Sequence, residues 1–466
     1  MRQCSHGAFL TGCAILFGSA TWAATPGPLD PPFTSTVNLG FNDLAVGQPV
    51  VQAEVVDPDS GASLGPVFSQ PFLLDTGATG IFIAGGTFYD LADFLNNGNV
   101  VVTNAATELT GAGLVIEGQV GELGVGGVQV VDVSKPYDVH VRTGSTLLNT
   151  VSDARMLVNG AANFGSFAGI IGMPAMVGKV TTLDMSVWSG GLGDFNFDLG
   201  DIDDYLDNLE QLETSGNMAV SIGSAVPAPA SPDRRLSIPV AFKQFDYVND
   251  PPVTQFTVPE NAPLPFTSVT YRNGNAAPFT SHDVLIDTGA QISIINSQIA
   301  IAMGLDRNND GFITADDLDP LDPNEQTITV SGVSGEVDAP VLGIDGMEII
   351  TEQGVKLTWS PYLLVLDIDE EIPAIFGADL ITSGWSAVLL ATFADLLGLP
   401  PGPTPTDGNF LGVHFDFRDL LINDPADATG RMYFDLAHAV PEPGVLVLIG
   451  LGSAMILAPG RRRKRR

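Results

Sequence analysis

Two segments of this chain, far apart in the sequence, carry the same motif in the same setting. Three apolar residues lead into Asp-Thr-Gly-Ala at residues 72–78, and the arrangement recurs at residues 284–290. Each half later contains a short apolar stretch that ends in glycine, at residues 169–172 and 374–377. Short apolar runs bounded by glycine turns are typical of buried β-strands. We therefore expect a mainly β protein built from two equivalent halves.

The order of these signals divides the chain into five segments. We expect a first lobe at residues 25–225 and a second lobe at residues 236–440, with a proline-rich linker, residues 226–235, between them. Prolines favour an extended connector. A leader at residues 1–24 and a tail at residues 441–466 flank the two lobes.

The charge and the cysteine content exclude several kinds of function. The formal net charge is −35, from 54 acidic and 19 basic residues, so the chain repels phosphate backbones and we expect no nucleic-acid binding. The two cysteines, Cys4 and Cys13, lie in the leader. The mature chain is therefore left without a disulfide, a thiol nucleophile or a thiolate metal site. The H-E-x-x-H pattern of zinc peptidases is absent from the sequence.

The first 24 residues have the features of a secretory signal peptide. A basic residue near the start is followed by an apolar stretch and then by small residues. The segment from Leu10 to Cys13 is similar to a bacterial lipoprotein box, so lipidation of Cys13 is the alternative. In both cases we expect the lobes to be exported.

The tail has three parts in a fixed order. Pro441-Glu442-Pro443 is followed by a largely apolar run, residues 444–460, and then by six basic residues, 461–466. This arrangement resembles the PEP-CTERM sorting tail of bacteria. The resemblance implies recognition by an exosortase-type sorting enzyme, with contact to the membrane through the apolar run. The alternative is a plain C-terminal membrane anchor, whose basic end stays in the cytoplasm.

The two motifs place one carboxylate in each half, Asp75 and Asp287. Two like charges a few ångströms apart cannot both ionise, so such a pair shares one proton. One carboxylate then acts as a base toward water and the other as an acid toward a carbonyl oxygen. Glycine at positions 77 and 289 permits a tight turn, and the hydroxyls of Thr76 and Thr288 can bond backbone across the boundary between the halves.

These features resemble the pepsin and retropepsin family of aspartic proteases over most of residues 35–440. The resemblance implies a bilobed, double-psi β-barrel-type fold with two pseudo-symmetric lobes and a central cleft. It implies that Asp75 and Asp287 are catalytic on a peptide or protein substrate, without a cofactor for catalysis. Because both carboxylates lie in one chain, we expect a monomer. By the same resemblance, a glycine-bearing hairpin forms the flap over the substrate, at residues Gly111, Ala112 and Gly113.

Two departures from the pepsin pattern affect the expected activity. Pepsin-like flaps carry a tyrosine, whereas this chain has none between Tyr89 and Tyr137. Ala78 and Ala290 follow the two motifs, where pepsins usually carry a hydroxyl residue. A hydroxyl there would stabilise the ionised carboxylate and lower its pKa. We therefore expect a less acidic pH optimum than that of pepsin.

A twelve-residue segment, Asp306 to Asp317, fits the spacing of a calcium-binding loop. Oxygen ligands fall at the required positions and glycine falls at position 6. The predicted ligands are Asp306, Asn308, Asp310, Phe312 through its carbonyl, Thr314 and Asp317. The alternative is an acidic turn held by local hydrogen bonds. A bound calcium ion would stiffen the second lobe and take no part in catalysis.

The strongest rival function is that of a surface or matrix protein that keeps the protease fold and binds without cutting. Fold alone does not prove activity. The intact Asp-Thr-Gly in both halves favours the enzyme, because a binding module does not need both carboxylates. A processing peptidase with one dedicated partner at the cell envelope is the third reading.

Overall fold

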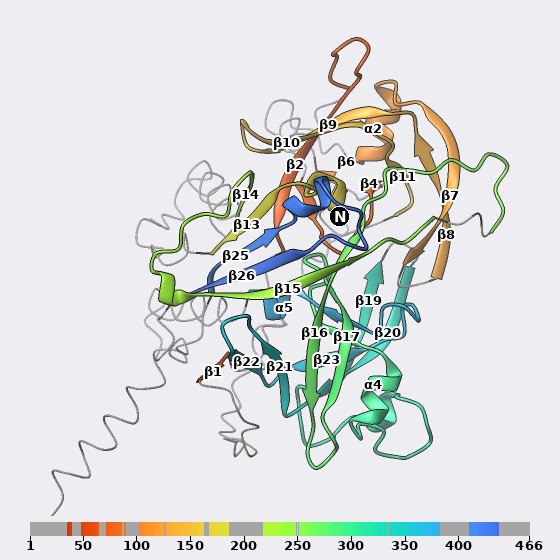
Figure 1. Ribbon diagram of the computed structural model, residues 1–466. Helices are drawn as coiled ribbons and strands as arrows, with labels where there is room; N and C mark the ends of the chain where they lie inside the picture. The colour runs from red at the N-terminus through yellow and green to blue at the C-terminus, as the bar shows by residue number, and fades with distance from the viewer. Residues whose placement is uncertain are drawn as a thin grey trace, which may run out of the picture. The chain divides into compact units, whose positions relative to one another are not determined.

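The structure is a computed structural model of the chain, shown in Figure 1. It describes residues 35–39, 48–64, 71–85, 88–89, 102–124, 127–162, 167–185, 218–247, 249, 251–332, 335–382 and 410–437. The predicted leader, residues 1–24, and the predicted tail, residues 441–466, lie outside these described residues.

The described residues of the first half lie mostly in strands. Its strands are β1 (Ser35–Asn38), β2 (Val50–Val56), β3 (Pro71–Leu74), β4 (Ile81–Ala84), β5 (Phe88–Tyr89), β6 (Val102–Thr103), β7 (Ile116–Gly124), β8 (Gly127–Ser134), β9 (Tyr137–Thr143), β10 (Thr146–Ala154), β11 (Leu157–Asn159), β12 (Gly169–Ile171), β13 (Val180–Asp184) and β14 (Ala219–Gly223). The helices among its described residues are α2 (Ala105–Gly111) and a 3-10 turn, Met173–Ala175.

The second half repeats this composition. Its strands are β15 (Arg235–Lys243), β16 (Leu264–Arg272), β17 (Phe279–Ile286), β18 (Ile294–Ile295), β19 (Gln326–Gly332), β20 (Gly335–Gly343), β21 (Gly346–Ile350), β22 (Val355–Trp359), β23 (Tyr362–Val365), β24 (Ala374–Phe376), β25 (Phe410–Asp416) and β26 (Gly430–Leu436). Its helices are α4 (Ser297–Ala302), α5 (Ala378–Ile381) and the 3-10 turns Pro232–Arg234, Ala315–Asp317 and Arg418–Leu421.

The two halves share one strand order, which explains the repeated sequence signals. In the first half the order is β2-β3-β12-β4-β11-β8-β7, and in the second half it is β16-β17-β24-β18-β23-β20-β19. In each half a strand from late in the sequence lies between the strands that flank the Asp-Thr-Gly loop. It runs parallel to the strand before the loop and antiparallel to the strand after it. The predicted mainly β, bilobed fold is confirmed.

The inserted strands also explain why the motif follows a continuous apolar run. In β3, Phe72 and Leu74 enter one hydrophobic core, whereas Leu73 enters a second core on the other side of the sheet. Ile171 and Ile170 of β12 divide between the same two cores. A strand buried on both faces needs apolar residues at every position. The sequence therefore lacks the alternation of a half-exposed strand at this point.

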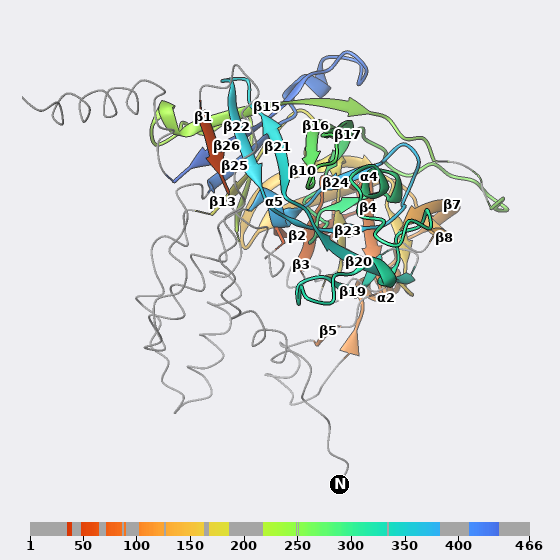
Figure 2. The same ribbon diagram turned by 90° about the horizontal axis from the view of Figure 1, so that it is seen from below.

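A third group of strands contains segments from both halves. Its order is β14-β13-β25-β26-β15, so β13, from before the predicted linker, pairs with β25, from after it. Figure 1 shows β26 between β25 and β15. Strand β1 pairs with β22 of the second half, next to β21, as Figure 2 shows. Because strands from before and after residues 226–235 pair with each other, the sheet does not mark a boundary there. The predicted lobe boundary therefore stays a prediction.

The second core of the first half is closed by the β7–β8 hairpin and by Tyr247. Val120 of β7 packs in this core, and the Tyr247 ring packs against it from the segment after β15. Glu122, two positions along β7, is half-buried and lies opposite Gln129 of β8. Burial raises the pKa of Glu122 to about 8. Burial and the charge of Glu122 raise the pKa of the Tyr247 hydroxyl as well.

We predict that Glu122 makes the protein less stable as the pH rises. The folded state holds the Glu122 proton up to a pH of about 8, whereas the unfolded chain releases it near pH 4.3. Between these values the folded state binds more protons, so the free energy of unfolding falls by up to about 1.4 kcal/mol per pH unit. Urea unfolding at pH 5 and pH 8 measures this slope.

Glu122→Gln should remove that part of the slope and be more stable than the parent at pH 8. Glu370→Gln, at an exposed position before β24, is the matched control. Equal slopes for the parent and Glu122→Gln would show that Glu122 ionises normally in the folded protein.

Candidate active site

Each predicted catalytic aspartate follows the strand that precedes its loop and is anchored to the inserted strand. The backbone N–H of Asp75 donates to the carbonyl of Ile171, at 3.0 Å, at the end of β12. The N–H of Asp287 donates to the carbonyl of Phe376, also at 3.0 Å, at the end of β24. The same bond in both halves fixes the two aspartates at equivalent places.

The two Asp-Thr-Gly loops are tied to each other by a crossed set of threonine hydrogen bonds. The Thr76 hydroxyl donates to the Ile286 carbonyl, and the Thr288 hydroxyl donates to the Leu74 carbonyl, both at 2.7 Å. Each hydroxyl also accepts the backbone N–H of the other threonine at 3.1 Å. Both threonines are 1% exposed. The predicted bonding of Thr76 and Thr288 across the two halves is present in the structure.

This crossed set of threonine hydrogen bonds, the brace, brings the two carboxylates together. Asp75 is buried and its carboxylate lies beside that of Asp287, since the Gly77 N–H donates to Asp75 at 2.7 Å and a Cβ added to Gly77 would lie 2.4 Å from Cγ of Asp287. Burial raises the pKa of Asp75 well above its usual range, and the adjacent Asp287 carboxylate raises it further. Backbone N–H groups of Gly77 and Gly289 act in the opposite direction. One proton held between two carboxylates is the state that this arrangement favours.

Gly77 and Gly289 permit the turn and also leave space for the carboxylate of the opposite half. A Cβ atom added to Gly77 would lie 2.4 Å from Cγ of Asp287, and one added to Gly289 would lie 2.4 Å from Cγ of Asp75. Real Cβ atoms do not approach other carbon atoms so closely. Each glycine therefore leaves the room that the carboxylate of the other half occupies.

The hairpin predicted for the flap at Leu109–Gly113 is wrong, because this segment ends a helix. Asn104 caps α2 by accepting the N–H of Thr107, at 2.6 Å. The buried residues of α2 lie on one helical face: Ala105, Ala106 and Leu109. Gly111 is the last helical residue, Ala112 caps the helix, and Gly113 has φ +108°. The glycines that suggested a hairpin turn belong to a helix C-terminus, where positive φ is common.

The hairpin that matches the one in the second half lies further along the chain. Strands β7 and β8 take the places in the first half that β19 and β20 take in the second. In the second half, residues 330–335 lie at the end of this hairpin, where β19 pairs with β20 up to Gly332 and Gly335. A flap formed by Gly111, Ala112 and Gly113 has no support in the structure.

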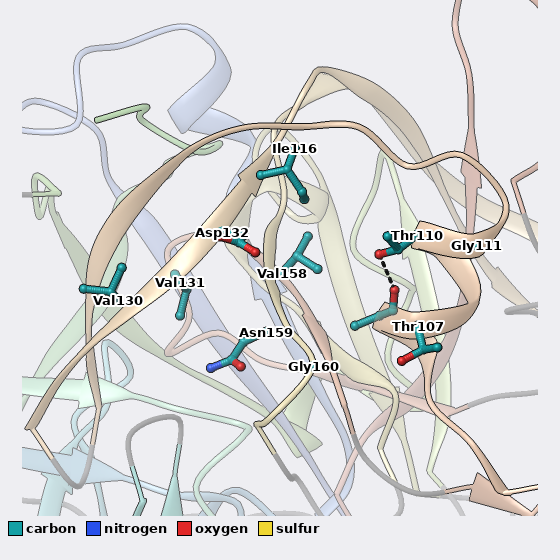
Figure 3. A pocket seen from close by; sticks show the side chains of 11 residues that line it. Thr107, Thr110, Gly111, Ile116, Val130, Val131, Asp132, Val158, Asn159 and Gly160 are labelled. Atoms are coloured by element: carbon teal, nitrogen blue, oxygen red, sulfur yellow. Dashed lines mark hydrogen bonds between the residues drawn. The ribbon is translucent and has the colours of Figure 1, made fainter. Parts of the chain in front are cut away.

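A cavity of about 560 Å³ lies between α2 and the strands β7, β8 and β11 (Figure 3). Thr110 and Gly111 line it on the helix side, and Asp132 and Asn159 line it on the strand side. The Thr110 hydroxyl is bonded to the carbonyl of Ala106 at 2.6 Å, as the dashed line shows. Neither Asp75 nor Asp287 is among the residues that line this cavity. The carboxylate pair is therefore a separate site.

The predicted calcium loop is held by bonds among its own residues. The Asp306 carboxylate accepts the N–H groups of Asp310 and Gly311, at 3.2 and 2.9 Å. Asp317 is fully buried and accepts backbone N–H groups from residues 307, 308 and 314. The oxygen ligands suit calcium. However, the described residues contain no group of three or more His, Cys, Asp or Glu that could hold a metal ion. Calcium binding stays a prediction.

Sequence reasoning missed two residues that contact the Asp-Thr-Gly loops. The Gln48 side chain donates to the carbonyl of Gly289. The Tyr247 hydroxyl lies 2.8 Å from the Thr79 hydroxyl, just after the first motif. Both residues belong to segments without a motif, and each reaches the loop of the opposite half. Such contacts leave no local pattern in the sequence.

Comparisons with known proteins do not assign the chain to a family. No family model matches it, and no curated protein matches it. Among solved structures the chain is similar to basic 7S globulin from soybean, with 10% identity over 84% of this chain and 95% of that chain, at a TM-score of 0.32. A likeness at this score carries no argument. In the described residues, no helix is long and apolar enough to cross a membrane.

We predict that Thr288→Val weakens the contact between the halves. Valine keeps the shape but removes the hydroxyl, which leaves the Leu74 carbonyl and the Thr76 N–H without their partners. A buried polar group without a partner costs about 1–3 kcal/mol. The free energy of unfolding, measured in urea, should therefore fall by about 2–4 kcal/mol.

Thr280→Val is the matched control. Thr280 lies on β17 in the same half and is exposed, and its hydroxyl bonds the hydroxyl of the half-buried Thr270 at 2.9 Å. Exposed substitutions usually change stability by about 0.5 kcal/mol or less. Equal losses in the free energy of unfolding for the two variants would mean that the brace does not stabilise the contact between the halves.

Proposed function

We propose that the protein is an aspartic endopeptidase with Asp75 and Asp287 as its catalytic pair. The observation that carries this proposal is the pairing itself, in which the threonine bonds hold the two loops so that each carboxylate lies against the motif glycine of the opposite half. Bringing two carboxylates together costs free energy, because like charges repel and burial disfavours both charges. A purely structural site would gain nothing from this cost.

The chemistry follows from one shared proton. The ionised carboxylate removes a proton from a water molecule, whose oxygen forms a bond to the peptide carbonyl carbon. The protonated carboxyl gives its proton to the carbonyl oxygen, so a neutral tetrahedral diol forms. The protonated carboxyl then gives its proton to the amide nitrogen while the ionised carboxylate takes a proton from one hydroxyl of the diol. The C–N bond breaks, an amine and one new carboxylic acid leave, and the pair again holds one proton. The reaction needs no cofactor.

The environment of the pair supports activity at weakly acid pH. The pair is active only while it holds one proton, so activity is lost when both carboxyls are protonated or both are ionised. The raised pKa of Asp75 extends the one-proton state toward neutral pH. Alanine at positions 78 and 290 supplies no hydroxyl to counteract this effect. The pH optimum is therefore less acidic than that of pepsin.

The ends of the chain suggest where this peptidase works. From the sequence of residues 1–24 and 441–466 we infer export, followed by recognition of the tail by an exosortase-type enzyme and contact with the membrane. A single chain supplies both carboxylates, so the active form is a monomer. The segment Asp306–Asp317 would bind calcium as structural support only. The alternative function, a surface protein that binds peptides without cutting them, uses the same site.

The test is hydrolysis of a mixed peptide library by the purified protein between pH 3 and 7, with calcium present. The parent should cleave with an optimum at weakly acid pH. Asp75→Asn and Asp287→Asn should each lower the rate at least about 100-fold, because neither can take part in proton transfer.

Asp283→Asn controls for the substitution itself, because Asp283 is an exposed aspartate on β17 that pairs with Lys243. It should cleave like the parent. Cleavage that survives Asp75→Asn or Asp287→Asn would contradict the catalytic pair. Binding of library peptides by the folded parent without any cleavage would favour the non-catalytic surface protein.

A further inference from the structure

Gln48 reaches the catalytic loop of the second half from the first half. It lies just before β2 and is partly buried. Its side-chain amide donates to the Gly289 carbonyl. Its amide oxygen accepts from the side chain of Gln291 at 3.1 Å, which holds the amide in one orientation. Gln48 therefore has a fixed geometry against the loop that carries Asp287.

The peptide group that Gln48 contacts is itself bonded to Asp287. The Gly289 carbonyl and the Ala290 N–H belong to one peptide group, and that N–H donates to Asp287 Oδ1 at 3.0 Å. Gly289 N–H donates to the same oxygen at 2.7 Å. Hydrogen bonds in a chain polarise one another, so a donor on the carbonyl makes the N–H a stronger donor. A stronger donor favours the charged form of Asp287.

The first half lacks this arrangement. Asp75 Oδ1 accepts the N–H of Gly77, at 2.7 Å, from its own loop. Among the residues that the structure describes, no side chain donates to the Gly77 carbonyl as Gln48 does to that of Gly289. Asp75 is also more buried than Asp287. The two carboxylates therefore have unequal surroundings in an otherwise symmetric site.

We propose that Gln48 is a positioning residue that holds the 289–290 peptide against Asp287 and so directs the negative charge of the pair to Asp287. Asp287 is then the base that activates water, and Asp75 carries the proton that goes to the substrate carbonyl. Burial and the neighbouring charge raise the pKa of Asp75, in agreement with this division. The assignment of roles rests on the proposed function, whereas the effect of Gln48 on the charge does not.

The test is Gln48→Met, which keeps the length of the side chain and removes the donor. Without the donor the charged form of Asp287 is less stable, so the lower apparent pKa of the pair should rise by about 0.3–1 unit. The acid limb of the kcat/KM profile should move to higher pH by the same amount. At the optimum we expect kcat to fall about 2- to 10-fold, with KM unchanged.

Two further variants separate hydrogen bonding from packing. Gln48→Lys restores a donor and adds a positive charge, so the acid limb should return to the parent position or move below it. Gln326→Met, at an exposed position on β19, should leave the profile unchanged. A purely steric role for Gln48 would give Gln48→Met and Gln48→Lys the same profile, and that result would overturn the proposal.

The effect on the charge is also measured without a substrate. Titration of ¹³C-labelled aspartate carboxyls by NMR, assigned with Asp75→Asn and Asp287→Asn, reports the lower apparent pKa of the pair in the folded protein. A rise in Gln48→Met supports the proposal even if the parent cleaves no peptide, in which case only the proposed function fails. An unchanged lower pKa in Gln48→Met overturns the proposal and leaves the proposed function standing.

Discussion

The crossed hydrogen bonds between Thr76 and Thr288 are the interaction on which the site depends. Each hydroxyl donates to the backbone of the opposite half and accepts the other threonine's N–H. Because these groups are buried, an unmade bond would leave a polar group without water to replace its partner. The two loops are therefore held in one relative position. Two carboxylates that repel each other stay close because separating the two loops would break these buried hydrogen bonds, at a cost in free energy.

Each half supports this brace with nearly the same arrangement of strands and loop. In each half an inserted strand anchors the aspartate through its N–H, and the motif glycine leaves room for the opposite carboxylate. In a strictly symmetric site, the shared proton would bind either carboxylate equally well. Gln48 and the unequal burial of the two aspartates break that symmetry. The proposed sharing of a proton thus rests on the duplication, and the proposed division of roles rests on contacts outside the motif.

Sequence reasoning located the carboxylate pair, since Asp75 and Asp287 stand in a motif repeated with its apolar context. The repeated signals also predicted the inserted strands β12 and β24. The helix α2 was misread as a hairpin, because a glycine that ends a helix looks like a glycine in a turn. Gln48 was not predicted, because only the fold brings the segment before β2 to a loop of the other half. The pairing of β13 with β25 was hidden for the same reason.

The most direct test of the shared proton is neutron diffraction from a deuterated crystal grown near pH 5. We predict that the carboxyls of Asp75 and Asp287 lie within hydrogen-bonding distance. We also predict a single deuterium between them, bonded to Asp75 and directed at Asp287. Carboxyls that lie apart, or that each carry a deuterium or none, would contradict the paired site.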